Sequence, residues 1–198
     1  IIIDAVKPLE EEPETNGSTH GRENIYGLTR DDEARIRESI PSAHRVVPVK
    51  HVRKDGRLGE RALELRLVGT TPDWFDIVDR EIIAGRILTR RDFDQRAGVC
   101  VLTEHGARRL LATEHTVGQD VRVGSHYFEV IGIIRSEQVS GSIQTPDRNI
   151  DAYIPYNVAR QRYGDLEVTR STGSRARERV ELHQILVQVE DIERVEAT

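Results

Sequence analysis

Residues 68–134 constrain the fold of this chain more than any other part, because they alternate short apolar runs with residues that end or begin elements. Gly69, Pro72, Gly85 and Gly118 lie between these runs. Glycine adopts turn and bulge conformations, and proline cannot donate to a strand ladder. The spacing therefore predicts short strands interspersed with small helices.

The first piece predicts a short helix. Pro72 suits the first helical position and Thr71 the cap before it. Trp74, Phe75 and Ile77 are then expected to anchor this helix on the core.

The later pieces predict a strand at residues 82–88 that is broken by Gly85, and a buried strand at 99–102. Thr103 is expected to cap a helix after the buried strand. The side chains expected to face inward from that helix are Ala107, Leu110 and Leu111. A hairpin is expected next, with strands at residues 121–123 and 127–134 around Gly124 and Ser125.

The sequence before this stretch predicts a strand at residues 1–6, a loop at 9–24 and a helix. Thr29 is a candidate cap of that helix, with Asp32 completing an imperfect capping box, and Pro41 stops it. Two strands are expected next, at residues 46–52 and 63–68, around a turn at 54–56.

The sequence after residue 134 predicts two further loops and two further strands. The expected order is a loop at 136–149, a strand at 152–154 ended by Pro155, a helix capped by Asn157 and stopped by Gly164, a loop at 165–179, and a strand at 182–189. Strands mixed with helices in this way indicate an α+β fold.

Composition excludes some functions. The net charge is −5 and aromatic residues make up 5% of the 198 residues, which disfavours binding to phosphate backbones and to single-stranded bases. Glutamates at residues 10–14 and arginines at 170–179 are interpreted as solvated loop surface. The sequence contains no apolar run of about 18–20 residues that could span a membrane. It begins with three isoleucines and no methionine, so we expect a fragment of a longer chain.

The sequence predicts no catalytic, cofactor or metal site. Cys100 lies inside an apolar run, where a thiol acts as a small hydrophobe. The chain has no G-x-S-x-G, GxGxxG, GxxxxGK or HExxH motif. Loop and surface positions are expected for the seven histidines, which are His20, His44, His51, His105, His115, His126 and His183. We hypothesise a structural ion pair between Arg86 and Asp92.

The order of these signals resembles the extracytoplasmic domain of MacB/FtsX-type ABC transporter permeases. The first matching motifs are LT-x-x-D at Leu28, Thr29 and Asp32, GT-x-P-x-W-F at Gly69, Thr70, Pro72, Trp74 and Phe75, and GR-x-L-T-x-x-D at Gly85, Arg86, Leu88, Thr89 and Asp92. The later ones are V-x-V-L at residues 99–102, VG-x-x-V-x-V at 117–123, F-x-V-I-G at 128–132 and Y-I-P at 153–155.

The resemblance implies a porter-like α/β subdomain at residues 1–70 and 151–198, and a smaller β-rich inserted subdomain at 71–150. The family continues with another helix and strand after the last strand found here, so we expect the porter-like subdomain to be incomplete. The loops at 9–24 and 165–179 match no family motif and are expected to differ with the partner.

The resemblance also implies a function without catalysis in this domain. It implies a periplasmic domain of an inner-membrane permease that relays the motion of a cytoplasmic ATPase to a substrate or partner outside, in export, lipoprotein release or signalling. Implied partners are a periplasmic adaptor, a lipoprotein or a cell-wall hydrolase regulator, with a dimeric parent and no cofactor. The alternative is a free-standing exported module that binds a ligand or protein.

Overall fold

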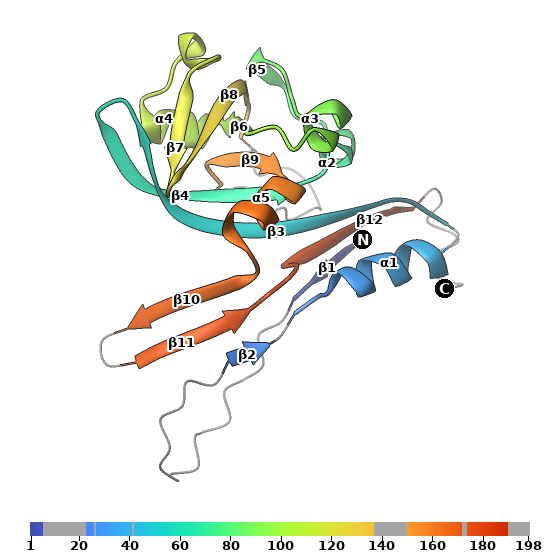
Figure 1. Cartoon of the computed structure of the whole chain (residues 1–198). Coiled ribbons are helices and arrows are strands. Elements are labelled where there is room, and N and C mark those ends of the chain that lie inside the picture. The colour runs from blue at the N-terminus through green and yellow to red at the C-terminus, as the bar shows by residue number, and fades with distance from the viewer. Residues whose placement is uncertain (6–22, 26, 41, 137–149, 172–173, 190–198) are drawn as a thin grey trace. The chain divides into compact units, whose positions relative to one another are not determined.

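The computed structural model describes residues 1–5, 23–25, 27–40, 42–136, 150–171 and 174–189 and shows a mixed α+β, sheet-rich chain (Figure 1). It divides into two compact units. The first unit comprises Ile1–Pro48 and Tyr163–Thr198, and the second comprises Val49–Arg162. The boundaries expected from the family resemblance are at residues 70/71 and 150/151.

In the first unit, a sheet joins the two ends of the chain. Strand β1 (Ile2–Asp4) pairs antiparallel with β12 (Gln184–Val189), and β12 lies beside the beginning of β3 (Ala43–Leu58). The amino group of Ile1 donates to the carbonyl of Val187 at 2.8 Å. The buried side chains on β12 are Ile185, Leu186 and Val187. The strands expected at residues 1–6 and 182–189 are therefore confirmed.

Helix α1 (Arg30–Ser39) begins with the expected capping box. The Thr29 hydroxyl accepts from the Asp32 N–H at 3.1 Å, and the Asp32 carboxylate accepts from the Thr29 N–H at 2.9 Å. The Arg30 guanidinium pairs with Glu181 at 3.0 Å, and Arg37 donates to the carbonyl of Val46 at 3.0 Å. None of the helix residues is buried, so these polar contacts hold α1 to the rest of the first unit.

The loop expected at residues 165–179 is instead a hairpin, so this prediction is wrong. Strands β10 (Leu166–Ser171) and β11 (Ser174–Arg179) pair antiparallel, and β11 pairs in parallel with β2 (Glu23–Ile25). The polar sequence gave no strand signal, although main-chain groups of any sequence can pair in a sheet. Most residues of the loops expected at 9–24 and 136–149 lie outside the described residues.

The second unit is built on a closed ring of strands. The order around the ring is β3, β4 (Arg61–Thr70), β9 (Ala152–Pro155), β6 (Val99–Thr103), β8 (His126–Ile134) and β7 (Asp120–Val123). Strand β7 closes it by pairing with both β8 and β3. Strand β5 (Ile82–Gly85) adds to β8 outside the ring.

The ring encloses the core of this unit. All five residues of β6 are buried, as expected for the strand at 99–102. Burial alternates along β7, where Val121 and Val123 are 1% exposed. Phe128 and Val130 of β8 are fully buried. The hairpin expected around Gly124 is confirmed by the pairing of β7 with β8.

The turn expected at residues 54–56 lies further along the chain. Strand β3 runs through these residues to Leu58, and the chain turns at Gly59, whose φ is +55°. Gly56 pairs with Val123 of β7, and a Cβ on it would lie 2.0 Å from Leu65 Cδ1. The glycine therefore allows close packing where β3 meets β7, which the sequence pattern could not distinguish from a turn.

Two expected helix caps are corrected. Helix α2 (Asp73–Ile77) has Pro72 at its cap position and no side-chain cap bond, so Thr71 is not the cap. Helix α5 (Tyr156–Tyr163) begins one residue before Asn157. The Asn157 side-chain amide instead donates to the carbonyl of Phe93, a contact far away in the sequence. Gly164 stops α5 with φ +68°, as expected.

Helix α4 (Glu104–Leu110) keeps its expected start but not its expected inward face. The Thr103 hydroxyl accepts from the Gly106 N–H at 3.0 Å, which confirms the cap. Leu110 is 2% exposed, but Leu111 is 72% exposed. Leu111 adopts the left-handed conformation that ends the helix, with φ +57°, so its side chain leaves the core.

We expect Leu111→Gly to raise the free energy of unfolding by roughly 0.5–1 kcal/mol. The left-handed conformation costs a leucine about 1–2 kcal/mol, and glycine avoids this strain but loses about 0.5–1 kcal/mol more backbone entropy on folding. The neighbouring Leu110→Ala should lower it by about 2–5 kcal/mol through the loss of buried volume. Thermal and urea unfolding of the two variants measure both effects. Equal destabilisation by the two changes would contradict this account of the helix end.

Candidate functional site

The signature residues that carried the family resemblance contact one another in the core. Trp74 and Phe75 of α2 pack against Tyr153 of β9, with ring centroids 4.2 and 5.6 Å from the Tyr153 ring. All three rings are buried. The expectation that Trp74 and Phe75 anchor α2 is confirmed, whereas Ile77 is half-buried. The G-T-x-P-x-W-F and Y-I-P motifs thus form one aromatic cluster.

The GR-x-L-T-x-x-D and F-x-V-I-G motifs meet at the end of β5. Gly85 has φ +68°, and a Cβ there would lie 2.2 Å from the carbonyl oxygen of Ile131. A Cβ on Gly132 would lie 2.2 Å from the carbonyl oxygen of Arg86. The Arg86 N–H donates to that Ile131 carbonyl at 2.9 Å. Both glycines are needed because the two backbones touch here.

The hypothesised pair of Arg86 and Asp92 is present. The guanidinium donates to the two carboxylate oxygens at 2.6 and 3.0 Å. The Thr89 N–H and hydroxyl also donate to Asp92, at 2.9 and 2.5 Å, in a capping box that begins α3 (Arg90–Asp94). The hydrogen bonds from Arg86, with those from Thr89, lower the pKa of Asp92 to about 2 despite its burial.

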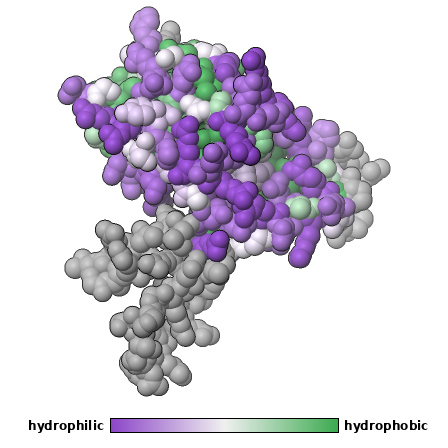
Figure 2. Space-filling model, in the orientation of Figure 1, coloured by the Kyte–Doolittle hydropathy of each residue, from purple (hydrophilic) through white to green (hydrophobic). Residues whose placement is uncertain are grey.

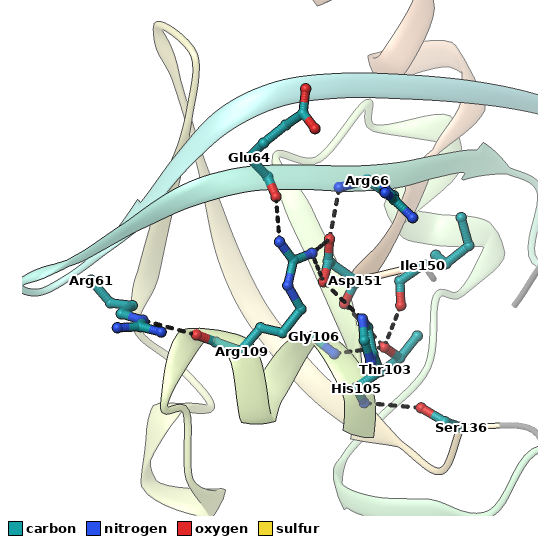
Figure 3. Close-up of polar contacts among 10 residues, drawn as sticks. All are labelled: Arg61, Glu64, Arg66, Thr103, His105, Gly106, Arg109, Ser136, Ile150 and Asp151. Carbon is teal, nitrogen blue, oxygen red and sulfur yellow. Dashed lines mark hydrogen bonds and ion pairs between the residues drawn. The ribbon is translucent and has the colours of Figure 1, made fainter. Parts of the chain in front are cut away.

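A buried carboxylate that the sequence analysis missed lies between Ile150 and β9. The Asp151 side chain is fully buried and accepts from Arg109 Nη1 at 2.7 and 2.6 Å and from the Arg66 N–H at 2.8 Å (Figure 3). Arg109 Nη2 donates to the carbonyl of Glu64 at 2.9 Å. The only sequence signal was an aspartate next to an apolar strand.

The backbone of Asp151 is bound as tightly as its side chain. Its N–H donates to the carbonyl of Arg66 and its carbonyl accepts from the Thr103 N–H, at 2.8 and 2.9 Å. The Thr103 hydroxyl donates to the carbonyl of Ile150 at 2.6 Å. A Cβ on Gly106 would lie 2.0 Å from the Asp151 carbonyl oxygen, so α4 touches this backbone directly.

This network, from Arg66 through Asp151 to Arg109, holds β4, α4 and the start of β9 together. At the beginning of α4, the His105 N–H donates to the Ser136 hydroxyl at 2.9 Å (Figure 3). Ser136 and Ile150, which flank residues 137–149, are thus both bound near the same helix end. The network is a structural clamp on the two chain segments that enter and leave residues 137–149.

Most titratable side chains of this region are engaged in internal contacts or buried. Both Asp92 and Asp151 are occupied by arginines, so neither carboxylate is placed to act as a base. Burial raises the pKa of the Cys100 thiol to about 12, which leaves it protonated and a poor nucleophile. His105 Nε2 lies 3.9 Å from Asp151 Oδ1. No group of three or more potential metal ligands occurs among the described residues.

None of the helices in the described part of the chain is both long and apolar enough to cross a membrane.

The closed ring, the motif contacts and the two arginine–aspartate pairs define a mixed α+β, sheet-rich scaffold. The family model of the MacB-like periplasmic core domain matches residues 5–198, and the chain belongs to this family.

Curated relatives are considerably longer proteins. Over 91 residues the chain is 32% identical to the macrolide export ATP-binding/permease protein MacB of Aggregatibacter actinomycetemcomitans, a match that covers 46% of this chain and 14% of the relative. Over 133 residues it is 24% identical to the pyoverdine export ATP-binding/permease protein PvdT of Pseudomonas aeruginosa, covering 67% and 20%. The match thus spans a fifth or less of each relative.

Solved structures share the fold. The periplasmic region of MacB from Actinobacillus actinomycetemcomitans aligns with a TM-score of 0.62 at 22% identity, over 84% of this chain and 68% of that one. The extracellular domain of the ABC-type transporter YknZ from Gram-positive bacteria aligns with a TM-score of 0.64 at 18% identity, over 86% and 77%.

We expect Asp92→Asn to lower the free energy of unfolding by about 2 kcal/mol at pH 7, because the pKa of Asp92 is about 2 in the folded chain and near 3.8 otherwise. A depressed pKa stabilises the fold above about pH 4, and this contribution disappears as the pH falls toward 2. The difference between wild type and variant should therefore shrink over that window. Urea unfolding from pH 2 to 7 measures it, with the exposed Asp94→Asn as control. A pH-independent difference would contradict the pairing with Arg86.

We expect Arg109→Leu to lower the free energy of unfolding by about 3 kcal/mol, because it leaves the fully buried Asp151 without its cation. Arg108→Leu is the matched control, since that neighbour is 72% exposed and its i,i+4 pair with Glu104 contributes about 0.3–0.5 kcal/mol. In the double variant Arg109→Leu with Asp151→Asn, part of the loss should be recovered. Additive losses in this cycle would argue against the clamp.

Proposed function

We propose that this chain is the extracytoplasmic domain of an ABC transporter permease, and that it relays ATP-driven motion from the cytoplasmic side to a substrate or partner outside the membrane. The observation that carries the proposal is the match of the MacB-like periplasmic core family to residues 5–198. The names of the relatives MacB and PvdT, which are export ATP-binding/permease proteins, favour export as the direction.

The packing of the second unit suits a mechanical role. A close-packed interior has low compressibility and transmits strain, so a domain with such an interior moves as one body. We expect the ring of strands closed by β7, the ion pair of Asp92 with Arg86 and the clamp at Asp151 to resist internal deformation. An applied displacement would then reach a distant surface instead of being absorbed.

The chemistry of the transporter would lie outside this domain. ATP hydrolysis belongs to a cytoplasmic ATP-binding part, either a separate subunit or another domain of the parent chain. We propose that the parent is an inner-membrane protein that works as a pair. A periplasmic adaptor, a lipoprotein or a cell-wall hydrolase regulator would receive the motion, and the domain itself acts without catalysis, cofactor or metal.

The test is hydrogen–deuterium exchange on the full-length parent protein, purified in mild detergent from its own cells, with and without ATP. We expect amide exchange within residues 1–198 to change by at least about twofold in some segments when ATP binds, because relayed motion alters the strain at hinges. The same measurement with ADP is the control for nucleotide binding without the ATP-bound state.

A parent protein that needs no detergent, carries or co-purifies no ATPase and shows no change in exchange would overturn this proposal. That result would favour the free-standing exported binding module.

A further inference from the structure

The outer face of β3, β4 and β7 carries pairs of like charges directly opposite each other. The register places Arg53 opposite Arg66 and Asp55 opposite Glu64 across β3 and β4. It places Arg57 opposite Arg122 across β3 and β7. We call these six side chains the charged face, and each opposing pair a rung. The order of the rungs along β3 is positive, negative, positive.

The charged face is accessible and belongs wholly to the second unit. Five of its residues are exposed and Arg66 is half-buried. On the side of the molecule drawn in Figure 2, hydrophilic side chains likewise dominate the surface of the described residues. Side chains directly opposite each other on neighbouring strands lie about 4.5–5.5 Å apart at Cβ, so each rung brings two like charges close together.

Each rung places two like charges opposite each other, while the neighbouring rung along β3 carries the opposite charge. Like charges directly opposite each other destabilise a sheet. Among the described residues, no ion pair joins any member of the charged face to an opposite charge. Arg57 and Arg122 donate only to the carbonyls of Gly59 and Gly124, at 2.8 and 2.9 Å. The four guanidiniums therefore keep most of their donors available.

We infer that the charged face is a docking surface for another extracytoplasmic protein, whose surface presents carboxylates over the two arginine rungs and a basic side chain between them. Residues two apart on a strand are separated by about 6.7 Å, so the two arginine rungs lie about 13 Å apart. Arginine suits this role because its planar fork binds carboxylates through two hydrogen bonds.

A second copy of the chain does not fit this face. Two identical positive, negative, positive faces repel at every rung when they are aligned. Shifted by one rung, they pair two rungs and leave an arginine rung of each copy uncovered.

A uniform polyanion fits poorly as well. A membrane surface or an anionic polymer would place negative charge against Asp55 and Glu64. Only a surface with negative, positive and negative charge in that order is attracted at all three rungs. Protein surfaces carry such complementary arrangements of charge. The inference rests on the proposed function only in that the face is exposed outside the cytoplasm.

The test is site-specific photo-crosslinking in the full-length parent, expressed in its own cells. The photoreactive residue replaces Ala62, which is exposed and lies opposite Arg57 on β4. Gln95, exposed at the end of α3, is the control position for the crosslinker. We expect a crosslink from position 62 to a different protein, at a crosslinked peptide with acidic residues on both sides of a basic one.

Two charge variants separate pattern from net charge. Arg53→Glu with Arg66→Glu should lower the crosslink yield at least about tenfold. Asp55→Arg with Glu64→Arg should also lower it, although this variant makes the face more positive. Arg91→Glu with Arg160→Glu reverses two exposed charges elsewhere and should leave the yield unchanged. Thermal unfolding of each variant checks that the fold is kept.

Several outcomes would overturn the inference. They are a crosslink to a second copy of the chain, a crosslink to lipid alone, no crosslink, a yield that the Arg53 and Arg66 changes do not alter, or a yield that rises with the Asp55 and Glu64 changes. If the parent responds to ATP in hydrogen exchange but gives one of these crosslinking results, the docking inference is wrong and the proposed function still stands.

Discussion

The second unit depends on one strand, β7, which pairs with both β8 and β3 and so closes the ring. Closure removes the free edges that an open sheet would expose and encloses an interior of buried strand residues. It requires β3 to approach β7 closely, and Gly56 makes this possible because any side chain there would overlap Leu65. Helices α2, α4 and α5 then attach to strands whose positions are already determined.

Two buried carboxylates secure the places where irregular chain meets this ring. Asp92 binds Arg86 and caps α3, next to the backbone contact between Gly85 and Ile131. Asp151 binds Arg109 and the Arg66 backbone, where the chain enters β9. A buried charge is tolerated only with a partner in good geometry. Each pair therefore allows little local variation in the chain around it.

Many of the motif residues pack inside the fold. The aromatic cluster of Trp74, Phe75 and Tyr153 and the contact between Gly85 and Gly132 are packing solutions, and they explain why the motifs indicate a scaffold and not a reaction. The charged face of β3, β4 and β7, in contrast, lies on the surface, where packing does not restrict the residue type.

The sequence alone determined the features that arise from contacts within a few residues or from strand periodicity. These include the capping box of Thr29 and Asp32, the cap at Thr103, the hairpin at Gly124 and the buried strand at 99–102. Tertiary structure alone decided the turn at Gly59, the outward position of Leu111, the hairpin at 166–179 and the clamp at Asp151. The clamp joins residues 42 and 85 positions apart in the sequence. The attraction and hydrogen bonds between these groups offset the cost of removing their charges from water. No local pattern encodes which distant residues will be brought together in this way.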